Sequence, residues 1–372
     1  MIVFESREHT AQVARFGGVR ASEARTALRW WHDSHVDVWA RVDALIDRAP
    51  SEHDLQSHRL ELLAARRFRQ LDRRVPEDFA AAERFSAVAL LSVPVVLERM
   101  RKAYDGPAII FKGPEVAAAY ADPILRSFGD LDLLVPDPAA VSRALQGAGF
   151  ELVGDPELYV DIHHLRPLVI PGVPLPIELH SVPKWIEGRT PPPAAELFES
   201  AVPSASRTAD LSTLAREEHV LILAAHSWAH EPLRRLRDMV DVAAMLDAAD
   251  LDAVARLARR WGVGRLWATT LATVEALFGD RTTPWALRLW AQNLDRARER
   301  TVLENHTQRW LSDFWVLPPP VSLRRLPRRF ASEFGPAADE GWREKLSRAR
   351  LAVSHASRPR SQHDRELDER GR

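Results

Sequence analysis

The chain has 372 residues, of which 46% are hydrophobic and 28% are charged, and these values are typical of a soluble globular protein with two or three domains. The 51 basic residues nearly balance the 52 acidic ones, so a formal net charge of −1 provides no basic excess for wrapping duplex nucleic acid. Because the chain contains no cysteine, disulfides, thiolate zinc sites and cysteine nucleophiles are excluded.

The N-terminal part of the chain has the apolar spacing of helices. Leucine, valine and tryptophan recur at helical intervals over residues 22–104, and we expect an N-terminal helical region over residues 1–80. The first residues contain no continuous apolar stretch of the signal-peptide type. The longest apolar run, residues 85–97, is too short to span a bilayer and contains Pro94. We therefore expect a cytoplasmic protein without a membrane partner.

Short strands and helices alternate in the next part of the chain. The run PAIIFKG is a strand that ends in glycine, and PEVAAAYAD is a short helix with a proline in its first turn. Further strands are predicted in DLDLLV and VPLPIELHSVP, with a helix in DPAAVSRALQGAGF that ends at a glycine. The pattern predicts mixed α and β elements over roughly residues 105–185, within a core that we expect over residues 81–190.

The remainder of the chain is predicted to be mainly helical. A helical domain is expected over residues 191–316, where LILAAHSWAH and RLRDMVDVAAML show the clearest periodicity. Residues 317–355 are predicted to form a linker rich in proline and arginine, followed by a helix. The segment 356–372 is charged and lacks apolar anchors, so it is predicted to be a disordered tail.

Two aspartates interrupt the apolar strand FGDLDLLVP. Because successive side chains on a strand point to opposite faces, Asp130 and Asp132 share one face and the neighbouring leucines share the other. Adjacent carboxylates on a core strand repel each other and lose hydration, so they persist there when a cation or a shared proton lies between them. The pattern predicts a cation site. The alternative is a strand end where both carboxylates are solvated or paired with Arg126.

The later strand IELH supplies a third carboxylate. Its two apolar residues alternate with Glu178 and His180, so Glu178 faces away from the apolar side. Three carboxylates on one sheet face can hold two divalent cations about 3.5–4 Å apart. Oxygen ligands in a chain without cysteine favour Mg²⁺ or Mn²⁺ over zinc. His180 shares the face of Glu178, and we expect it to support a metal ligand from behind.

The glycine turn FKGPE after the first strand is predicted to bind phosphate, because free backbone amides at a helix N-terminus attract anions. Lys112 either adds a point charge for phosphate or is a solvated lysine at the strand end. Arg126 either contacts nucleotide phosphate or pairs with an aspartate and relieves the carboxylate repulsion. Pro114 has no backbone N–H, so one phosphate donor is missing from the turn.

Together these motifs resemble the uncharacterised nucleotidyltransferase family of the polymerase-β superfamily. The motifs that carry the resemblance, over roughly residues 80–250, are FKG, Tyr120, Pro123, Leu125-Arg126, GDLDLLV, IELH, His226, His230 and RLRDMVDVAAML. The resemblance implies an α+β fold. In this fold, a polymerase-β-like nucleotidyltransferase core, made of a small mixed sheet with helices, is flanked by N-terminal and C-terminal helical regions.

The resemblance also implies roles for individual residues. The implied catalytic residues and metal ligands, with Mg²⁺ or Mn²⁺ as cofactor, are Asp130, Asp132 and Glu178. The implied nucleotide-binding residues are Lys112, Gly113, Arg126 and Gly129. The broader superfamily prefers Gly-Ser or Gly-Gly after the first strand, whereas this chain has Gly113-Pro114, and its interval from Gly113 to Asp130 is longer than in minimal members.

Residues of the later helical block are candidates for the wall of the cleft. His226 and His230 are four residues apart and so share a helix face. This is the spacing of a zinc pair, but HSWAH lacks the glutamate of H-E-x-x-H. The two histidines therefore face the cleft, pack in the core or, in the weakest reading, bind zinc. Arg237 and Asp241 have the same spacing and either form a helix-surface pair or face the cleft.

The sequence thus predicts an enzyme that transfers a nucleoside monophosphate from a nucleoside triphosphate to an acceptor hydroxyl and releases pyrophosphate. The near-neutral charge favours a small-molecule or protein acceptor over nucleic acid. The alternative is a non-catalytic binding or regulatory protein that keeps the fold, which the Gly113-Pro114 turn supports. A metallohydrolase based on His226 and His230 is the weaker third reading. The adjacent histidines at 163 and 164 could position a substrate.

Overall fold

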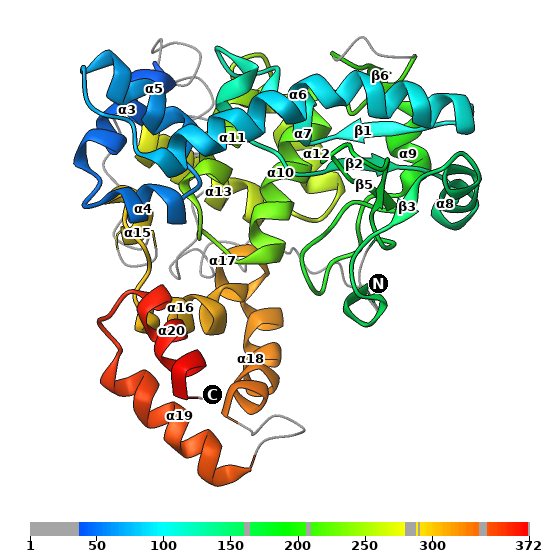
Figure 1. Ribbon diagram of the computed structural model, residues 1–372. Coiled ribbons are helices and arrows are strands. Elements are labelled where there is room, and N and C mark those ends of the chain that lie inside the picture. The colour runs from blue at the N-terminus through cyan, green and yellow to red at the C-terminus, as the bar shows by residue number, and fades with distance from the viewer. Residues whose placement is uncertain are drawn as a thin grey trace, which may run out of the picture.

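The computed structural model describes residues 37–159, 164–205, 210–279, 291–334 and 341–370, together with residue 288. A small mixed sheet lies among many helices, and the last helices of the chain lie together below the rest of the molecule in the view (Figure 1). This arrangement confirms the α+β fold predicted from the sequence. The first part of the predicted N-terminal helical region lies outside the described residues.

The described elements form three successive parts: the N-terminal helices, the strands with the helices between them, and the helices after the sheet. The N-terminal helices are α3 (Val38–Arg48), α4 (Glu52–Ser57), α5 (Glu61–Gln70) and α6 (Glu77–Ala103). The strands are β1 (Ile109–Phe111), β2 (Leu131–Leu134), β3 (Glu151–Leu152), β4 (Leu168–Val169), β5 (Ile177–His180), β6 (Val202–Pro203) and β7 (Ser212–Thr213). The helical segments between the strands are α7 (Gly113–Ala117), η2 (Pro123–Leu125), α8 (Pro138–Gly147), η3 (Pro156–Tyr159) and α9 (Ala194–Glu199). The helices after the sheet are α10 (Arg216–His230), α11 (Leu236–Leu246), α12 (Leu251–Arg260), α13 (Gly264–Phe278), α15 (Gln292–Asp295), α16 (Val302–Leu311), α17 (Asp313–Val316), α18 (Pro319–Phe334), α19 (Trp342–Ser354) and α20 (Arg360–Arg370).

The sheet has the strand order β3-β4-β5-β2-β1-β7-β6. The central strand β2 pairs in parallel with β5 and antiparallel with β1. Strand β7 continues the sheet beside β1, and β6 pairs antiparallel with β7. This hairpin lies within the segment 191–316, which was predicted to be a helical domain. The prediction is wrong there because strands of two residues are too short to show an alternating pattern.

The sheet separates two hydrophobic cores. Leu131 and Leu133 of β2 belong to the core that contains Val93 of α6 and Leu145 of α8. Leu134 belongs to the other core, which contains the buried residues of α10 and α11. Because the side chains of a strand alternate between faces, the polar residues of the central strands project towards α10 and α11.

Helix α6 is longer than the apolar run that indicated it. It continues through Pro94 for 27 residues, and by length and composition alone it could cross a membrane. We expected no segment long enough to span a bilayer, and the length of α6 contradicts that expectation. One such helix is weak evidence of a membrane span, because a core helix of a soluble protein passes the same test. One face of α6, which includes Val93, Leu97 and Met100, is buried in the core beside the sheet.

The proline-rich segment predicted to be a linker is part of helix α18. Pro319 lies at the first position of this helix, where a missing N–H breaks no helical hydrogen bond. The buried hydroxyl of Ser322 donates to the Asp313 carbonyl at 2.9 Å, and Arg325 forms ion pairs with Asp313 and Glu187. These contacts stabilise a helix in a segment whose proline content had predicted a linker.

The segment predicted to be a disordered tail contains helix α20. Its first turn is anchored by polar contacts. Arg360 contacts both carboxylate oxygens of Glu231 at 3.0 and 3.2 Å, and the amide and hydroxyl of Ser361 donate to Glu299 at 2.8 and 2.7 Å. The prediction looked for apolar anchors and so missed an attachment made by ion pairs and hydrogen bonds to distant residues.

Candidate functional site

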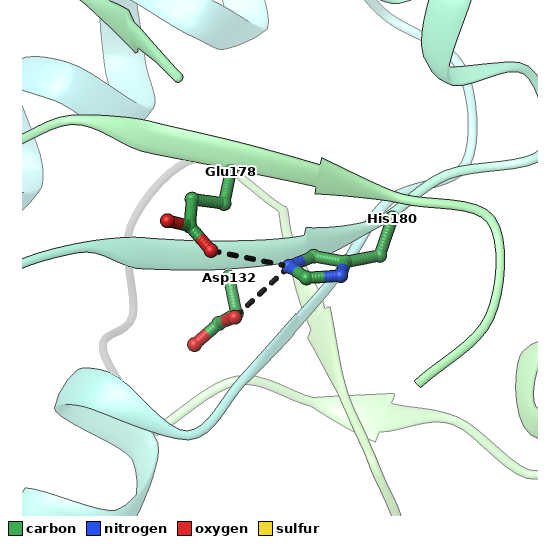
Figure 2. A group of neighbouring side chains, drawn as sticks. All are labelled: Asp132, Glu178 and His180. Carbon is green, nitrogen blue, oxygen red and sulfur yellow. Dashed lines mark ion pairs between the residues drawn. The ribbon is translucent and has the colours of Figure 1, made fainter. Parts of the chain in front are cut away.

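Strands β2 and β5 bring two carboxylates and an imidazole to one face of the sheet. The strands pair in parallel, with Asp132 opposite Glu178 and Leu134 opposite His180. The apolar neighbours of Asp132 and Glu178 lie in the core on the opposite face, as the alternation of a strand requires. The three polar side chains point towards one another (Figure 2).

These three side chains form a compact group. One ligand atom from each of Asp132, Glu178 and His180 lies within 4.8 Å of the others, an arrangement that could hold a metal ion. Nε2 of His180 is 2.9 Å from Oδ1 of Asp132 and 3.8 Å from Oε2 of Glu178 (Figure 2). The sequence placed Asp130 among the ligands and His180 behind them. In the structure His180 belongs to the compact group, whereas Asp130 lies just before β2 and is not part of that group.

Lys112 neutralises Asp132. Its Nζ atom is 3.0 Å from Oδ1 of Asp132, the same oxygen that contacts His180. Burial alone would raise the pKa of Asp132, but the Lys112 charge and the His180 contact hold that pKa well below its usual range. Lys112 is buried at the end of β1, so the reading as a solvated lysine is wrong. Its contact with phosphate stays a prediction.

The other two carboxylates are less well neutralised. Burial, followed by the charges of Asp130 and Asp132, raises the pKa of Glu178 to about 7. Burial and the Asp132 charge also raise the pKa of Asp130. Nε2 of His164 is 3.5 Å from Oε2 of Glu178. Burial and the mutual repulsion of the carboxylates are therefore incompletely offset by the neighbouring basic residues, and a bound cation would relieve both.

The turn after β1 does not present the predicted row of free amides. The Lys112 amide donates to Nε2 of His219 at 3.1 Å. The amides of Glu115 and Val116 both donate to the Lys112 carbonyl, at 2.9 and 3.3 Å, and the proline between has no N–H. Only the Gly113 amide lies outside these bonds. Most of the backbone amides that were predicted to bind phosphate at the N-terminus of α7 already donate to other groups, so the prediction is wrong for them.

Two buried histidines are expected to make the protein sensitive to acid. Burial lowers the pKa of His219 to about 3 and that of His58 to about 4. Each accepts a hydrogen bond from a backbone amide, from Lys112 and Leu236 respectively, and a protonated ring cannot do so. Because an unfolded histidine titrates near 6.5, the unfolded state binds protons below that pH that the native state does not bind. Stability should therefore fall as the pH decreases below 6.5, by about 4 kcal/mol at pH 5 for both histidines together.

Urea unfolding at pH 7 and pH 5 would measure this loss. In His219→Gln the side-chain oxygen can still accept from the Lys112 amide but does not titrate, so the variant should lose about 2 kcal/mol less than the parent between the two pH values. His53→Gln is the matched control, because His53 is exposed. Equal losses in the parent and in His219→Gln would contradict the prediction.

A buried ion pair holds the loop between α7 and β2. Nε and Nη2 of Arg126 donate to the two oxygens of Asp241 at 3.1 and 2.9 Å, and Nη1 donates to the Gly113 carbonyl at 3.2 Å. The Tyr120 hydroxyl donates to Asp241 at 2.6 Å. Asp241 therefore pairs with Arg126 and not with Arg237 on its own helix, so the reading as a helix-surface pair is wrong. It fails because this side of α11 is buried against the loop.

Beside these groups lies a pocket of about 630 Å³, lined by residues of the sheet and of the helices that follow it. Six basic and six acidic side chains line the pocket, so its net charge is near zero. The basic residues are Arg59, Lys112, Arg126, Arg234, Arg235 and Arg237. The acidic residues are Asp130, Asp132, Glu178, Glu231, Asp238 and Asp241.

A basic cluster of three arginines lies on the helical side of this pocket and consists of Arg59, Arg235 and Arg237. Burial, followed by the charges of Arg237 and Arg235, lowers the pKa of Arg59 to about 10. Nη1 of Arg237 donates to the Ser127 carbonyl at 3.2 Å, while its buried Nε has no hydrogen-bond partner among the described residues. Nearby carboxylates, including Asp238, offset part of the charge. The cluster still offers guanidinium donors to an anion in the pocket.

Of the remaining predicted residues, some line the pocket and others lie outside the described residues. Gly129 and His226 line the pocket, whereas the side chain of His230 and the whole of His163 lie outside the described residues. His164 also lines the pocket. Within the described part of the chain, the metal-type grouping does not include His226, so the structure adds no support for a metallohydrolase.

Sequence reasoning missed several residues of this site. It did not single out Lys184, His219, Arg59 or Arg235. Burial and the Lys112 charge lower the pKa of Lys184 to about 8, and the charge of Glu178 also acts on it. A signal for Lys184 was present, because the chain has only four lysines among its 51 basic residues and two of them are at this site. The others carry no local signal, since they lie far in sequence from the strands that hold the carboxylates.

One comparison with known proteins found a match for this chain. A family model described as uncharacterised nucleotidyltransferase matches residues 52–279, more than half of the chain. The matched segment contains the whole sheet, the compact group on β2 and β5, and all the pocket-lining arginines. No curated protein matches the chain.

Proposed function

Because this chain belongs to the family of uncharacterised nucleotidyltransferases, we propose that it transfers a nucleoside monophosphate from a nucleoside triphosphate to an acceptor hydroxyl in a metal-dependent reaction. The acceptor oxygen bonds to the α-phosphorus, the bond from that phosphorus to the bridging oxygen of pyrophosphate breaks, and the hydroxyl proton is released. The observation that carries the proposal is the convergence of Asp132, Glu178 and His180 beside a pocket of nucleotide size, which the two carboxylates line and behind which the imidazole is buried.

The donor atoms of the pocket fit a divalent metal ion. Asp132 and Glu178 would hold it through carboxylate oxygens, with Asp130 beside them as a further carboxylate and the His180 imidazole against Asp132. Carboxylate ligands suit Mg²⁺ and Mn²⁺, so we keep these ions as the proposed cofactor. When bound, such an ion would neutralise phosphate charge and lower the pKa of the attacking hydroxyl.

We assign phosphate binding mainly to side chains. The turn at Gly113 has lost most of its amide donors to internal bonds, whereas the guanidinium groups of Arg59, Arg235 and Arg237 line the opposite wall. Planar guanidinium groups bind phosphate oxygens in pairs. The near-zero net charge of the pocket supports metal dependence, because a triphosphate of about −4 charge needs added positive charge to be buried there.

The acceptor and the location complete the proposal. The formal net charge of −1 favours a small molecule or a protein as acceptor over nucleic acid. The helices after the sheet form the far wall of the pocket, since α10 and α11 supply many of its lining residues, and we propose that they select the acceptor. The absence of cysteine supports a cytoplasmic location.

A regulatory protein that binds nucleotide without transferring it is the second candidate. Two observations favour it: the amides of the Gly113 turn are engaged internally, and the Lys112 ammonium lies on the Asp132 oxygen that a metal would use. In this case the fold and the pocket are retained, and nucleotide binding has another purpose.

Calorimetric titration with each nucleoside triphosphate, with and without Mg²⁺, tests the proposal. Binding should require the metal and should be lost in Asp130→Asn/Asp132→Asn. Asp137→Asn is the matched control, because it makes the same change of acid to amide at an exposed residue that caps α8 and does not line the pocket. Metal-dependent binding without pyrophosphate release with any acceptor would favour the regulatory candidate. Absence of binding in the parent would contradict both.

A further inference from the structure

Helix α6 carries an apolar stripe on its exposed face, which we define as Val88, Leu91 and Val95, with Phe85 at its edge. These side chains are 45%, 75%, 52% and 44% exposed, which is unusual for large apolar residues grouped together. Figure 1 shows α6 along the upper edge of the molecule. We propose that this stripe binds the same stripe of a second copy of the chain, with the two helices antiparallel, so that the protein forms a symmetric dimer.

The stripe belongs to a longer series with the spacing of a helix–helix seam. Exposed residues recur along α6 at alternating intervals of four and three, which is the heptad repeat of paired helices. The members of the series are Glu77, Ala81, Arg84, Val88, Leu91, Val95, Glu98 and Lys102. All eight are exposed, so the seam is complete and accessible. Its centre is apolar and its ends are charged, as in a short antiparallel pair.

The charges at the two ends select the antiparallel orientation. With a two-fold axis between Val88 and Leu91, Leu91 of one copy meets Val88 of the other, and Glu77 meets Lys102 at both ends. A parallel pair would instead place Glu77 against Glu77 and Lys102 against Lys102. Glu77 now pairs with Arg84 across the helix surface, but both side chains are more than 60% exposed, and such a pair contributes little.

A second apolar stripe, on α19, is a poorer candidate for self-association. Trp342, Leu346 and Val353 are 63%, 54% and 77% exposed along that helix. The charged residues around them are mostly basic: Arg343, Glu344, Lys345, Arg348 and Arg350. Two copies of α19 would therefore repel each other, whereas two copies of α6 attract.

No residue of α6 lines the nucleotide pocket, so the proposed interface leaves that pocket open. The face of α6 opposite the stripe packs on the sheet core and holds the loop before β2, where Ser86 Oγ donates to the Ile124 carbonyl at 2.8 Å.

The length of α6 limits the size of the proposed interface, because a helix of 27 residues spans about 40 Å. A single helix pair is smaller than a standard interface, so we expect a dissociation constant of about 1 µM or weaker.

Sedimentation velocity of the full chain over about 1–100 µM tests the interface at concentrations around the expected constant. The parent should pass from monomer to dimer, and Leu91→Glu should remain monomeric. Val353→Glu is the matched control, because Val353 is exposed to the same degree as Leu91 but lies on α19. This variant should dimerise like the parent. A monomeric parent, or equal dimerisation of the parent and Leu91→Glu, would overturn the proposal.

Charge reversal tests the orientation without relying on an apolar substitution. Glu77→Lys and Lys102→Glu should each weaken the dimer about tenfold, and the double variant should restore it, because each reversed charge then meets its complement on the other copy. A double variant weaker than either single one would overturn the antiparallel register. If the parent stays monomeric but floats with phospholipid vesicles in a Leu91-dependent manner, the stripe is a membrane contact and the dimer is excluded.

Discussion

Replacement of Asp132 by Asn is expected to weaken Mg²⁺-dependent nucleotide binding by more than about 100-fold, since even residues behind a metal ligand typically change affinity 10–100-fold when removed. Asp132 is the central member of the compact group, where its Oδ1 contacts both Lys112 and His180. The same change should destabilise the metal-free protein by about 3 kcal/mol, because the buried Lys112 ammonium loses its partner. Function and stability should therefore fall together.

Glu178→Gln is expected to separate the two effects. The raised pKa of Glu178 means that the native state disfavours its carboxylate, so stability decreases as the pH rises from about 4.5 through 7. A neutral glutamine removes this penalty, and the metal-free variant should be more stable than the parent at pH 8 by about 1–2 kcal/mol. Nucleotide binding should still be lost with the metal ligand.

Urea unfolding of both variants at pH 8 in EDTA, followed by calorimetry with Mg²⁺ and nucleotide, measures the two quantities. Asp137→Asn again serves as the control and should match the parent in both assays. If Glu178→Gln destabilised the metal-free protein as much as Asp132→Asn does, the carboxylates would not be the unbalanced cluster described above. Undiminished nucleotide binding in both variants would remove the metal site from the proposal.

Replacement of Asp241 by Ala is expected to destabilise the protein by about 3–5 kcal/mol, the usual cost of breaking a buried ion pair from one side. The variant leaves the Arg126 guanidinium buried without a carboxylate and removes the acceptor of the Tyr120 hydroxyl. Because Arg126 also holds the Gly113 carbonyl, the turn beside the pocket should loosen as well.

The free energy of unfolding in urea, with a double-mutant cycle, measures this effect. In Arg126→Met/Asp241→Leu no charge is left unpaired, so the double variant should recover part of the loss. Arg256→Gln is the control, because Arg256 forms an exposed ion pair with Asp250 and its loss should change stability by less than about 1 kcal/mol. A loss of that size in Asp241→Ala would show that the buried pair contributes no more than an exposed one.

The sequence by itself determined the local features of the site. Alternation along DLDL and IELH placed Asp132 and Glu178 on the side of their strands opposite the adjacent leucines and isoleucine, and both predictions agree with the burial in the structure. The direction of a side chain on a strand depends only on backbone geometry, which is a local property. The resemblance carried by these short motifs was likewise sufficient to identify the family, since they lie within the matched residues.

The tertiary structure alone decided which of these groups meet. The pairing of β2 with β5 put Glu178 and His180 beside Asp132, and Asp241 reached Arg126 across 115 residues. It likewise decided that the Lys112 amide donates to His219 and that α20 is held by ion pairs. Such contacts join segments distant in sequence, so they depend on how the remaining chain packs between them, and no local pattern can encode them.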